Sequence, residues 1–288
     1  MNVIVGIDGT EQQPDALALG AQLSRVEGGR LVLAHVYPWD QTLRPDAEAL
    51  LRGASRLTGV PSTIRAVADP SVPHGLHRVA RDEEADVLVV GSSHRGPVGR
   101  ALLGGVGDRV VHGAPCAVAV APRGYADATP DTRRVGVAYD GSPEARRALA
   151  WAGGFAEAVG ATVAVLSVVE LPTVVGFAGV PYDVRGVEQP LREACRRELD
   201  EAVASLPDAV RATGELLDGP PAHALATAAA GVDLMVTGSR AHGAAHSTLL
   251  GSVSRALIHH APCPLVVVPR PRARHLARSR RSEAGAPA

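Results

Sequence analysis

Residues 238–253, GSRAHGAAHSTLLGSV, have a near-copy earlier in the chain, GSSHRGPVGRALLGGV at residues 91–106. Each copy follows a short apolar run, and each leads into a segment that ends at the sequence Ala-Pro-Cys. The glycines of the two copies have the same spacing, at 91, 96 and 104 and at 238, 243 and 251. A single glycine-rich turn is common between a strand and a helix, but two with matching spacing indicate a tandem repeat.

The two repeats also begin alike, because a shift of 132 residues lays VIVGIDGT (3–10) over VGVAYDGS (135–142). The glycine-rich copies align at a larger shift of 147, so the second repeat has extra residues, which we place in an enlarged loop at 171–190. The expected organisation is a first domain at 1–122, a linker at 123–133, a second domain at 134–270, and a basic, disordered tail at 271–288.

Within each repeat, short Val/Ile/Leu runs alternate with amphipathic stretches in the order βαβαβαβαβ. The apolar runs are continuous rather than alternating, which indicates strands buried on both faces in a parallel sheet. Ser142 and Pro143 are typical of the cap and first position of a helix. The sequence therefore predicts an α/β fold with two repeated doubly wound five-stranded parallel sheets and helices on both faces.

The composition excludes several classes of function. The chain has 288 residues and a net charge of -1, so no general attraction to nucleic acid is expected. It contains no lysine, which excludes both a Walker A lysine and a Schiff-base lysine. The three cysteines are too scattered for a disulfide framework, the N-terminus does not read as a signal peptide, and no apolar run approaches the roughly 18 residues of a membrane span. We expect a cytoplasmic protein without a membrane segment.

The glycine-rich turns are expected to bind an anion. Each leaves the carboxyl end of a strand and ends where a helix begins, at Gly104 and Gly105 or at Gly251 and Ser252. The first amides of a helix have no partner within it, and the helix dipole is positive there, so a phosphate is a suitable ligand. Ser252 adds a hydroxyl that can cap the helix or bind a phosphate oxygen, whereas Gly105 offers only its amide.

These residues carry a family resemblance over nearly the whole chain. An Asp after the first strand, a glycine-rich turn after the fourth and an Ala-Pro-Cys before the fifth resemble the universal stress protein family. The resemblance implies an adenine-nucleotide α-hydrolase-like fold, dimers formed through the last strand and, in one subclass, binding of ATP, with Mg²⁺ as its accompanying ion. We therefore expect a nucleotide-binding module that acts in a stress response through partners or oligomeric state, with no dedicated catalytic chemistry.

By resemblance, the aspartates approach adenine and ribose, the backbone of a valine after the second strand of each repeat contacts adenine, and the turns hold phosphates. The residues so assigned are Asp8, Val36, Gly91, Ser92, His94, Gly104, Gly105 and Val106 in the first repeat, and Asp140, Val168, Gly238, Ser239, Ala241, Gly251, Ser252 and Val253 in the second. The chain departs from the family pattern at His94 and Ala241, which replace its second glycine, and at Gly105, which replaces its Ser or Thr.

Four further expectations follow. The fifth strands, AVAVAP and PLVVVP, should meet at the boundary of an intramolecular pseudo-dimer, since two open edges would promote aggregation. The resemblance leaves a homodimer of the whole chain open as a further assembly. The apolar stretch VVGFAGV of the enlarged loop should cover the second site or a neighbouring subunit. The second site should bind the nucleotide more tightly, because only it has the serine.

Three alternatives stay open at this stage. The chain could be an ATP-hydrolysing or adenylate-forming enzyme, or an assembly module whose turns bind no nucleotide. Zinc is a weaker alternative, suggested by the pair His242 and His246 and by the group His259, His260 and Cys263, although a histidine pair at a helix C-terminus also suits the helix dipole.

Overall fold

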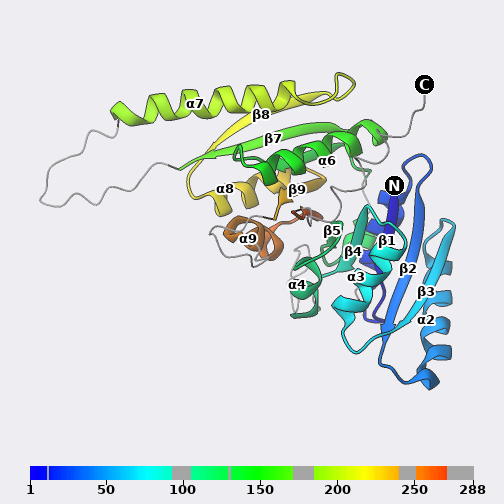
Figure 1. Ribbon diagram of the computed structural model, residues 1–288. Coiled ribbons are helices and arrows are strands. Elements are labelled where there is room, and N and C mark those ends of the chain that lie inside the picture. Colours follow the sequence, from blue (N-terminus) through cyan, green and yellow to red (C-terminus); the bar gives the residue numbers. More distant parts are fainter. Residues whose placement is uncertain (12, 93–104, 129–130, 171–184, 240–250, 271–288) are drawn as a thin grey trace, which may run out of the picture.

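The structure is a computed structural model that describes residues 1–288 except 12, 93–104, 129–130, 171–184, 240–250 and 271–288. Each repeat contributes five strands (Figure 1). Those of the first repeat are β1 (Asn2–Gly6), β2 (Arg30–Tyr37), β3 (Ser62–Ala68), β4 (Val87–Gly91) and β5 (Ala117–Ala121). Those of the second are β6 (Arg134–Ala138), β7 (Thr162–Val169), β8 (Ala212–Asp218), β9 (Leu234–Gly238) and β10 (Leu265–Val268).

Helices follow the strands in the predicted order. The first repeat and the linker contain α1 (Gln13–Ser24), η1 (Gln41–Leu43), α2 (Arg44–Leu57), α3 (Val72–Asp82), α4 (Gly105–Val111) and α5 (Tyr125–Ala128). The second repeat contains α6 (Pro143–Val159), α7 (Arg185–Ala204), α8 (Pro221–Ala228), η2 (Ala229–Gly231) and α9 (Ser252–His260). As predicted, α6 begins at Pro143 after the N-cap Ser142, whose hydroxyl accepts a hydrogen bond from the amide of Ala145.

All ten strands form one sheet in the order β3-β2-β1-β4-β5-β10-β9-β6-β7-β8. Strands within each repeat are parallel, whereas β5 and β10 pair in antiparallel register, with Val266 opposite Ala119. The prediction that the fifth strands meet is therefore confirmed. The strands of the first repeat therefore run antiparallel to those of the second. As a result, the carboxyl ends of the two sets of strands point in opposite directions within the shared sheet.

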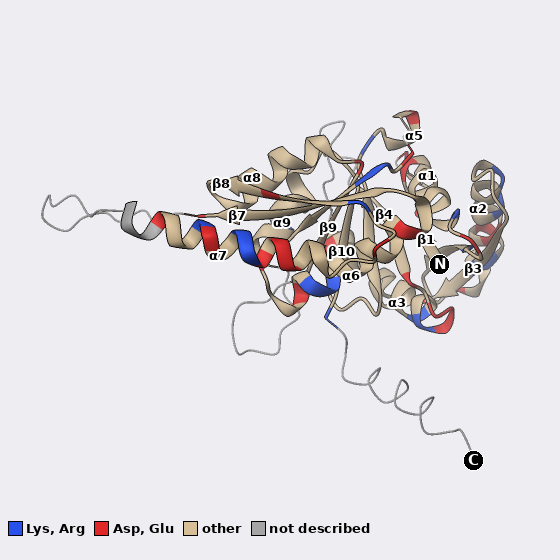
Figure 2. Cartoon of the chain, turned by 90° about the horizontal axis from the view of Figure 1, so that it is seen from above, with Lys and Arg blue, Asp and Glu red and all other residues tan. Residues whose placement is uncertain are grey.

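Helices cover both faces of this sheet. One face packs against α1, α2, α6 and α7, and the other against α3, α4, α8 and α9. The core beneath each face contains residues of both repeats, such as Leu33 with Val165 on one side and Leu88 with Met235 on the other. Charged residues of both signs are frequent along α7 (Figure 2). The two repeats therefore share continuous cores across the β5–β10 junction.

The linker contains a short helix that its polar, Gly- and Pro-bearing sequence did not predict. Asp15 in α1 is buried, and its carboxylate accepts hydrogen bonds from the amides of Gly124 and Ala126 at 2.9 and 2.8 Å. Tyr125 is buried against α1, and its hydroxyl donates to Gln22. These contacts supply the partners that the first amides of α5 lack within the helix, so tertiary contacts fix the start of the linker.

Two sequence expectations need correction. The enlarged loop expected at 171–190 ends earlier, because α7 begins at Arg185 and contains Pro190; residues 171–184, including VVGFAGV, lie outside the described residues. Val36 and Val168 lie within β2 and β7 rather than after them, because both strands extend further along their edge partners β3 and β8. Within the described parts of the chain, no helix is long and apolar enough to cross a membrane.

Candidate functional site

The second repeat has a cavity of about 260 Å³ at the carboxyl ends of its strands. β6 lies between β7 and β9 in the sheet, so the chain crosses to opposite sides of β6 at this point. Such switch points are where doubly wound sheets bind ligands. The lining includes Tyr139, Asp140, Ser142, Glu144, Ser167, Val168, Cys195, Glu198, Pro221, Leu225, Thr237, Gly238, Gly251, Ser252, Val253 and Ser254.

Asp140 lies in a tight turn between β6 and α6. Its carboxylate accepts a hydrogen bond from the amide of Ser142 at 3.1 Å, and Gly141 between them has a positive φ of 71°. A left-handed conformation favours glycine, which explains the Asp-Gly-Ser sequence. The turn leaves the Asp140 side chain exposed at the cavity.

One part of the cavity wall is apolar. Val168 at the end of β7, Pro221 at the start of α8 and the buried Leu225 line it. The hydroxyl-bearing Ser167, next to Val168 in β7, faces the same cavity and is 9% exposed. This part of the wall suits a flat, mostly apolar group with a few hydrogen-bonding atoms.

The opposite part of the wall presents backbone amides and hydroxyls. Gly251 precedes α9 and provides no side-chain cap, so the first amides of this nine-residue helix have no partner within it. Ser252 is the first residue of α9 and lines the cavity, so its hydroxyl lies at the start of the helix. The hydroxyl of Ser254 donates to the carbonyl oxygen of Gly238 at 2.8 Å, which ties the start of α9 to the end of β9.

Gly238 must be glycine for a steric reason. A Cβ at this position would lie 2.7 Å from the backbone carbon and oxygen of Glu144 in the first turn of α6. Real Cβ atoms do not approach backbone so closely, so any side chain here would separate β9 from α6. The start of the glycine-rich turn is therefore held directly against α6.

Glu144 is a buried carboxylate at this contact. Its Oε1 accepts hydrogen bonds from Arg270 at 2.8 Å and from Arg147 at 3.0 Å. Burial alone would raise the pKa of Glu144, but the hydrogen bonds from Arg270 and Arg147 hold it below its ordinary value. The carboxylate is therefore ionised at neutral pH, and the group of three carries a net positive charge beside the turn.

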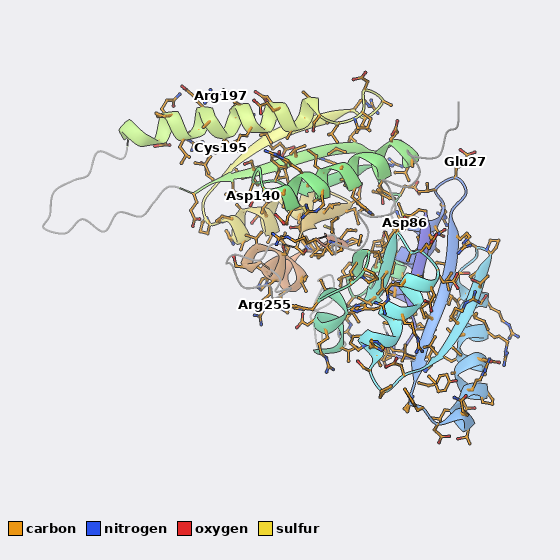
Figure 3. All side chains as sticks on the ribbon, in the orientation of Figure 1. Glu27, Asp86, Asp140, Cys195, Arg197 and Arg255 are labelled. Carbon is orange, nitrogen blue, oxygen red and sulfur yellow. The ribbon has the colours of Figure 1, made fainter. Side chains whose placement is uncertain are left out.

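The inner side of α7 completes the wall. Cys195 and Glu198, three residues apart on this helix, both line the cavity. Figure 3 shows Cys195 on the side of α7 that faces Asp140, with Arg197 on the far side. Sequence reasoning missed both residues, and their three-residue helical spacing before the buried Leu199 is the only signal in the sequence that could have indicated an inward face.

The family model for the universal stress protein family matches residues 1–122 and 131–269 of the chain. The chain belongs to this family. Universal stress protein Rv2005c of Mycobacterium tuberculosis is 30% identical over 291 residues, which cover 92% of this chain and 96% of the relative. A universal stress protein of Thermus aquaticus is 38% identical over 140 residues, 46% of this chain and 95% of its own length.

Solved structures agree at the level of the fold. A universal stress protein from Archaeoglobus fulgidus has a TM-score of 0.63 and 19% identity, and covers 93% of this chain and 98% of its own. A protein of unknown function from Pseudomonas aeruginosa has a TM-score of 0.68 and 17% identity, with coverages of 98% and 97%. The chain is thus a tandem universal stress protein with two similar halves.

In the first repeat the same turn is present, but fewer of the assigned residues can be placed. Asp8 accepts hydrogen bonds from the amide and hydroxyl of Thr10 at 3.0 and 2.8 Å, and Gly9 has a φ of 76°. Gly91 ends β4, and Ser92 follows it, buried, with its hydroxyl unpartnered among the described atoms. Gly105 and Val106 begin α4. His94, Gly104 and, in the second repeat, Ala241 lie outside the described residues.

A histidine occupies the first repeat where the second has Ser167. His35 lies in β2 at the position that corresponds to Ser167, and its Nδ1 is 2.7 Å from the carbonyl oxygen of Ile7. An imidazole is much larger than a serine side chain, so the two repeats differ in shape at this position. Among the residues that the structure places, no group of three metal-binding side chains is found, and His259 and His260 form the last turn of α9.

Proposed function

We propose that the second repeat binds an adenine nucleotide, ATP, and that the chain acts as a nucleotide-dependent regulatory module of the stress response. The observation that carries the proposal is the cavity, which brings Asp140, Val168, Gly238, Gly251 and Ser252 together from four separate parts of the sequence. The family resemblance, which rests on sequence motifs alone, assigns these same residues to nucleotide and so supports the proposal independently of the cavity.

The wall has three zones that suit the three parts of a nucleotide. The apolar zone at Val168 and Leu225 accommodates the base, the carboxylate of Asp140 accepts hydrogen bonds from ribose, and the amides at Gly251 and Ser252 receive phosphates. The cavity of about 260 Å³ is just below the range of roughly 300 to 1,000 Å³ that is usual for ligand pockets. It therefore suits the base and ribose, with the phosphates directed toward the end of the glycine-rich turn.

The proposal assigns binding rather than covalent chemistry to this site. The role of the chain's own residues is to hold the nucleotide: Asp140 through its Asx turn, Ser254 by fixing α9 on β9, and Glu144 by positioning Arg147 and Arg270. If ATP brings Mg²⁺, the ion neutralises phosphate charge. The chain then acts as a regulator because its nucleotide-free and nucleotide-bound states differ.

The test is to identify and measure the ligand. The full chain is purified, bound small molecules are released by denaturation, and anion exchange with mass spectrometry identifies them; calorimetry then measures ATP binding to the stripped protein. We expect ATP in the released fraction and one dominant binding event. Release of AMP or an adenylate would favour an enzyme instead, and a protein that neither carries nor binds a nucleotide would contradict the proposal.

A further inference from the structure

The turn after the first strand is covered by different side chains in the two repeats. In the first, a Cβ on Gly9 would lie 3.5 Å from Leu50 Cδ1, and in the second a Cβ on Gly141 would lie 3.0 Å from Glu198 Oε2. Leu50 in α2 and Glu198 in α7 therefore occupy equivalent positions over equivalent turns. An apolar side chain in one repeat corresponds to a carboxylate in the other.

The Glu198 carboxylate is available for a ligand. It lines the cavity together with Asp140, is exposed, and makes no hydrogen bond or ion pair with any residue in the described ranges. Three arginines of α7 are engaged or directed elsewhere. Arg192 pairs with Glu188 and Asp218. Arg196 donates to the carbonyl oxygen of Gly214, and Arg197 lies on the outer side of the helix (Figure 3). An ionised carboxylate only accepts hydrogen bonds, so Glu198 requires a donor from the ligand.

The place of Glu198 in the cavity determines which part of a nucleotide it meets. It lies over the Asp140–Gly141 turn of the central strand β6, between the apolar zone of β7 and α8 and the amide zone of β9 and α9. If the base and phosphates occupy those two zones, the sugar lies between them. Ribose has two hydroxyl donors there, whereas a phosphate on the same sugar would be repelled by two carboxylates.

We propose that Glu198 is a specificity-determining residue that accepts a hydrogen bond from a ribose hydroxyl and so selects ribonucleotides with an unmodified sugar. This inference rests on the proposed nucleotide site. A hydrogen bond to a charged acceptor corresponds to roughly a 10- to 100-fold change in affinity. Removing the ribose hydroxyl from the ligand or the carboxylate from Glu198 should lower the affinity by the same factor. Removing both should lower it no further than removing either one.

The test is calorimetry on the full chain with ATP, 2′-deoxy-ATP and 3′-deoxy-ATP. We expect the unmodified protein to bind ATP roughly 10- to 100-fold more tightly than one of the two analogues. Glu198→Leu, which copies the residue of the first repeat, should weaken ATP binding by that factor and abolish the preference. The affinity of Glu198→Leu for the weaker-binding analogue should stay within about fivefold of the unmodified protein's affinity for it, the range expected for loss of an exposed charge.

Glu201→Leu is the matched control, since it removes the same charge from the next turn of α7 at an exposed position that does not line the cavity. It should leave the sugar preference unchanged. A preference that survives in Glu198→Leu, or an equal loss for ATP and both analogues, would overturn the role of Glu198 while leaving the nucleotide site intact. Failure of the unmodified chain to bind ATP at all would overturn the proposed function and this inference with it.

Discussion

The two candidate sites share a backbone and an aspartate but differ in several other side chains. Both have an Asx turn with a left-handed glycine after the first strand, and both have a helix that starts after the glycine-rich turn. Five side chains at the second cavity are of interest because they differ from their counterparts in the first repeat. The differing pairs are Ser167 and His35, Glu198 and Leu50, Thr237 and Val90, Ser252 and Gly105, and Ser254 and Gly107.

The direction of these differences is consistent. In four of the five pairs the second repeat has a hydroxyl or carboxylate where the first has an aliphatic side chain or a glycine, and in the fifth it has a small serine in place of a ring. The fold needs only the turn glycine and the buried strands, so both repeats keep them. Side chains that would contact a ligand are free to diverge, and those that differ make the second site the more polar of the two.

The largest effect that tests this comparison is expected from the two aspartates. Asp140→Ala should reduce the affinity of the tighter site for ATP by about 100-fold, because a charged acceptor for ribose is lost. Asp8→Ala should leave that site unchanged. Calorimetry on both variants decides the ranking, and Asp140→Asn, which keeps an acceptor for the Ser142 amide, separates loss of charge from loss of the turn. If Asp8→Ala alone removed the tighter site, the tighter site would lie in the first repeat, and the ranking of the two affinities would be reversed.

The next effect concerns the first residue of helix α9, at the end of the glycine-rich turn. Ser252→Gly makes the second repeat resemble the first, and should weaken ATP binding roughly tenfold to a hundredfold through loss of a hydroxyl donor to a charged oxygen. The reverse change, Gly105→Ser combined with His35→Ser, should strengthen the first site in a titration. Equal affinities for Ser252→Gly and the unmodified chain would show that the hydroxyl contributes nothing.

A chemical reporter distinguishes the second site from the first. Burial raises the pKa of both Cys116 and Cys263 to about 12, so both stay protonated and unreactive at pH 8. Cys195, in the wall of the second cavity, is then expected to be the thiol that iodoacetamide alkylates. ATP at ten times its dissociation constant should slow the reaction about tenfold.

Cys195→Ser is the control for that measurement, since it should remove the fast reaction while leaving the other two thiols in place. Mass spectrometry of peptides identifies the labelled residue. Alkylation of Cys195 at an unchanged rate, in a protein that calorimetry shows to be saturated, would mean that ATP occupies the first repeat instead.

The smallest effect is expected from the ion pairs of Glu144, a feature of the second repeat. Glu144→Gln should lower the free energy of unfolding by about 1 kcal/mol at neutral pH, since Arg270 and Arg147 lose their charged partner. Because the pKa of Glu144 is held below its ordinary value of 4.5, its contribution is complete above that pH and is lost as the pH falls below it. Denaturant titrations should show a difference in the free energy of unfolding between the two proteins at pH 7 that disappears toward pH 3. A difference that does not change with pH would contradict this account.

The strands and their order of connection were predictable from the sequence because buried parallel strands are continuous apolar runs. The junction of β5 and β10 was predictable because each is a short apolar edge that needs a partner. The positions of Asp140, Gly238, Gly251 and Ser252 in one cavity followed from the resemblance, since the carboxyl ends of neighbouring parallel strands meet at one edge.

Other features depend on contacts between distant residues and left no local signal. The helix α5 is stabilised by the carboxylate of Asp15 in α1, which local propensity cannot reveal. Glu198 and Cys195 reach the cavity only because α7 packs beside β7 and β8 after an insertion of unpredictable path. The start of α7 was missed because Pro190 suggests a break, whereas the helix continues through this proline and lacks the hydrogen bond that its amide would have donated.

The antiparallel pairing of β5 with β10 has a consequence for how such a protein can evolve. A dimer of identical single-domain subunits joined through this edge has to carry the same residues at both of its sites. Here the linker joins the partners covalently, so their effective concentration is set by a tether of about a dozen residues and does not fall on dilution. Symmetry is no longer enforced, and each cell that makes the chain obtains the two unlike halves in a fixed one-to-one ratio. Duplication within one gene thus allows one half to specialise in recognition while the other keeps the shared sheet closed.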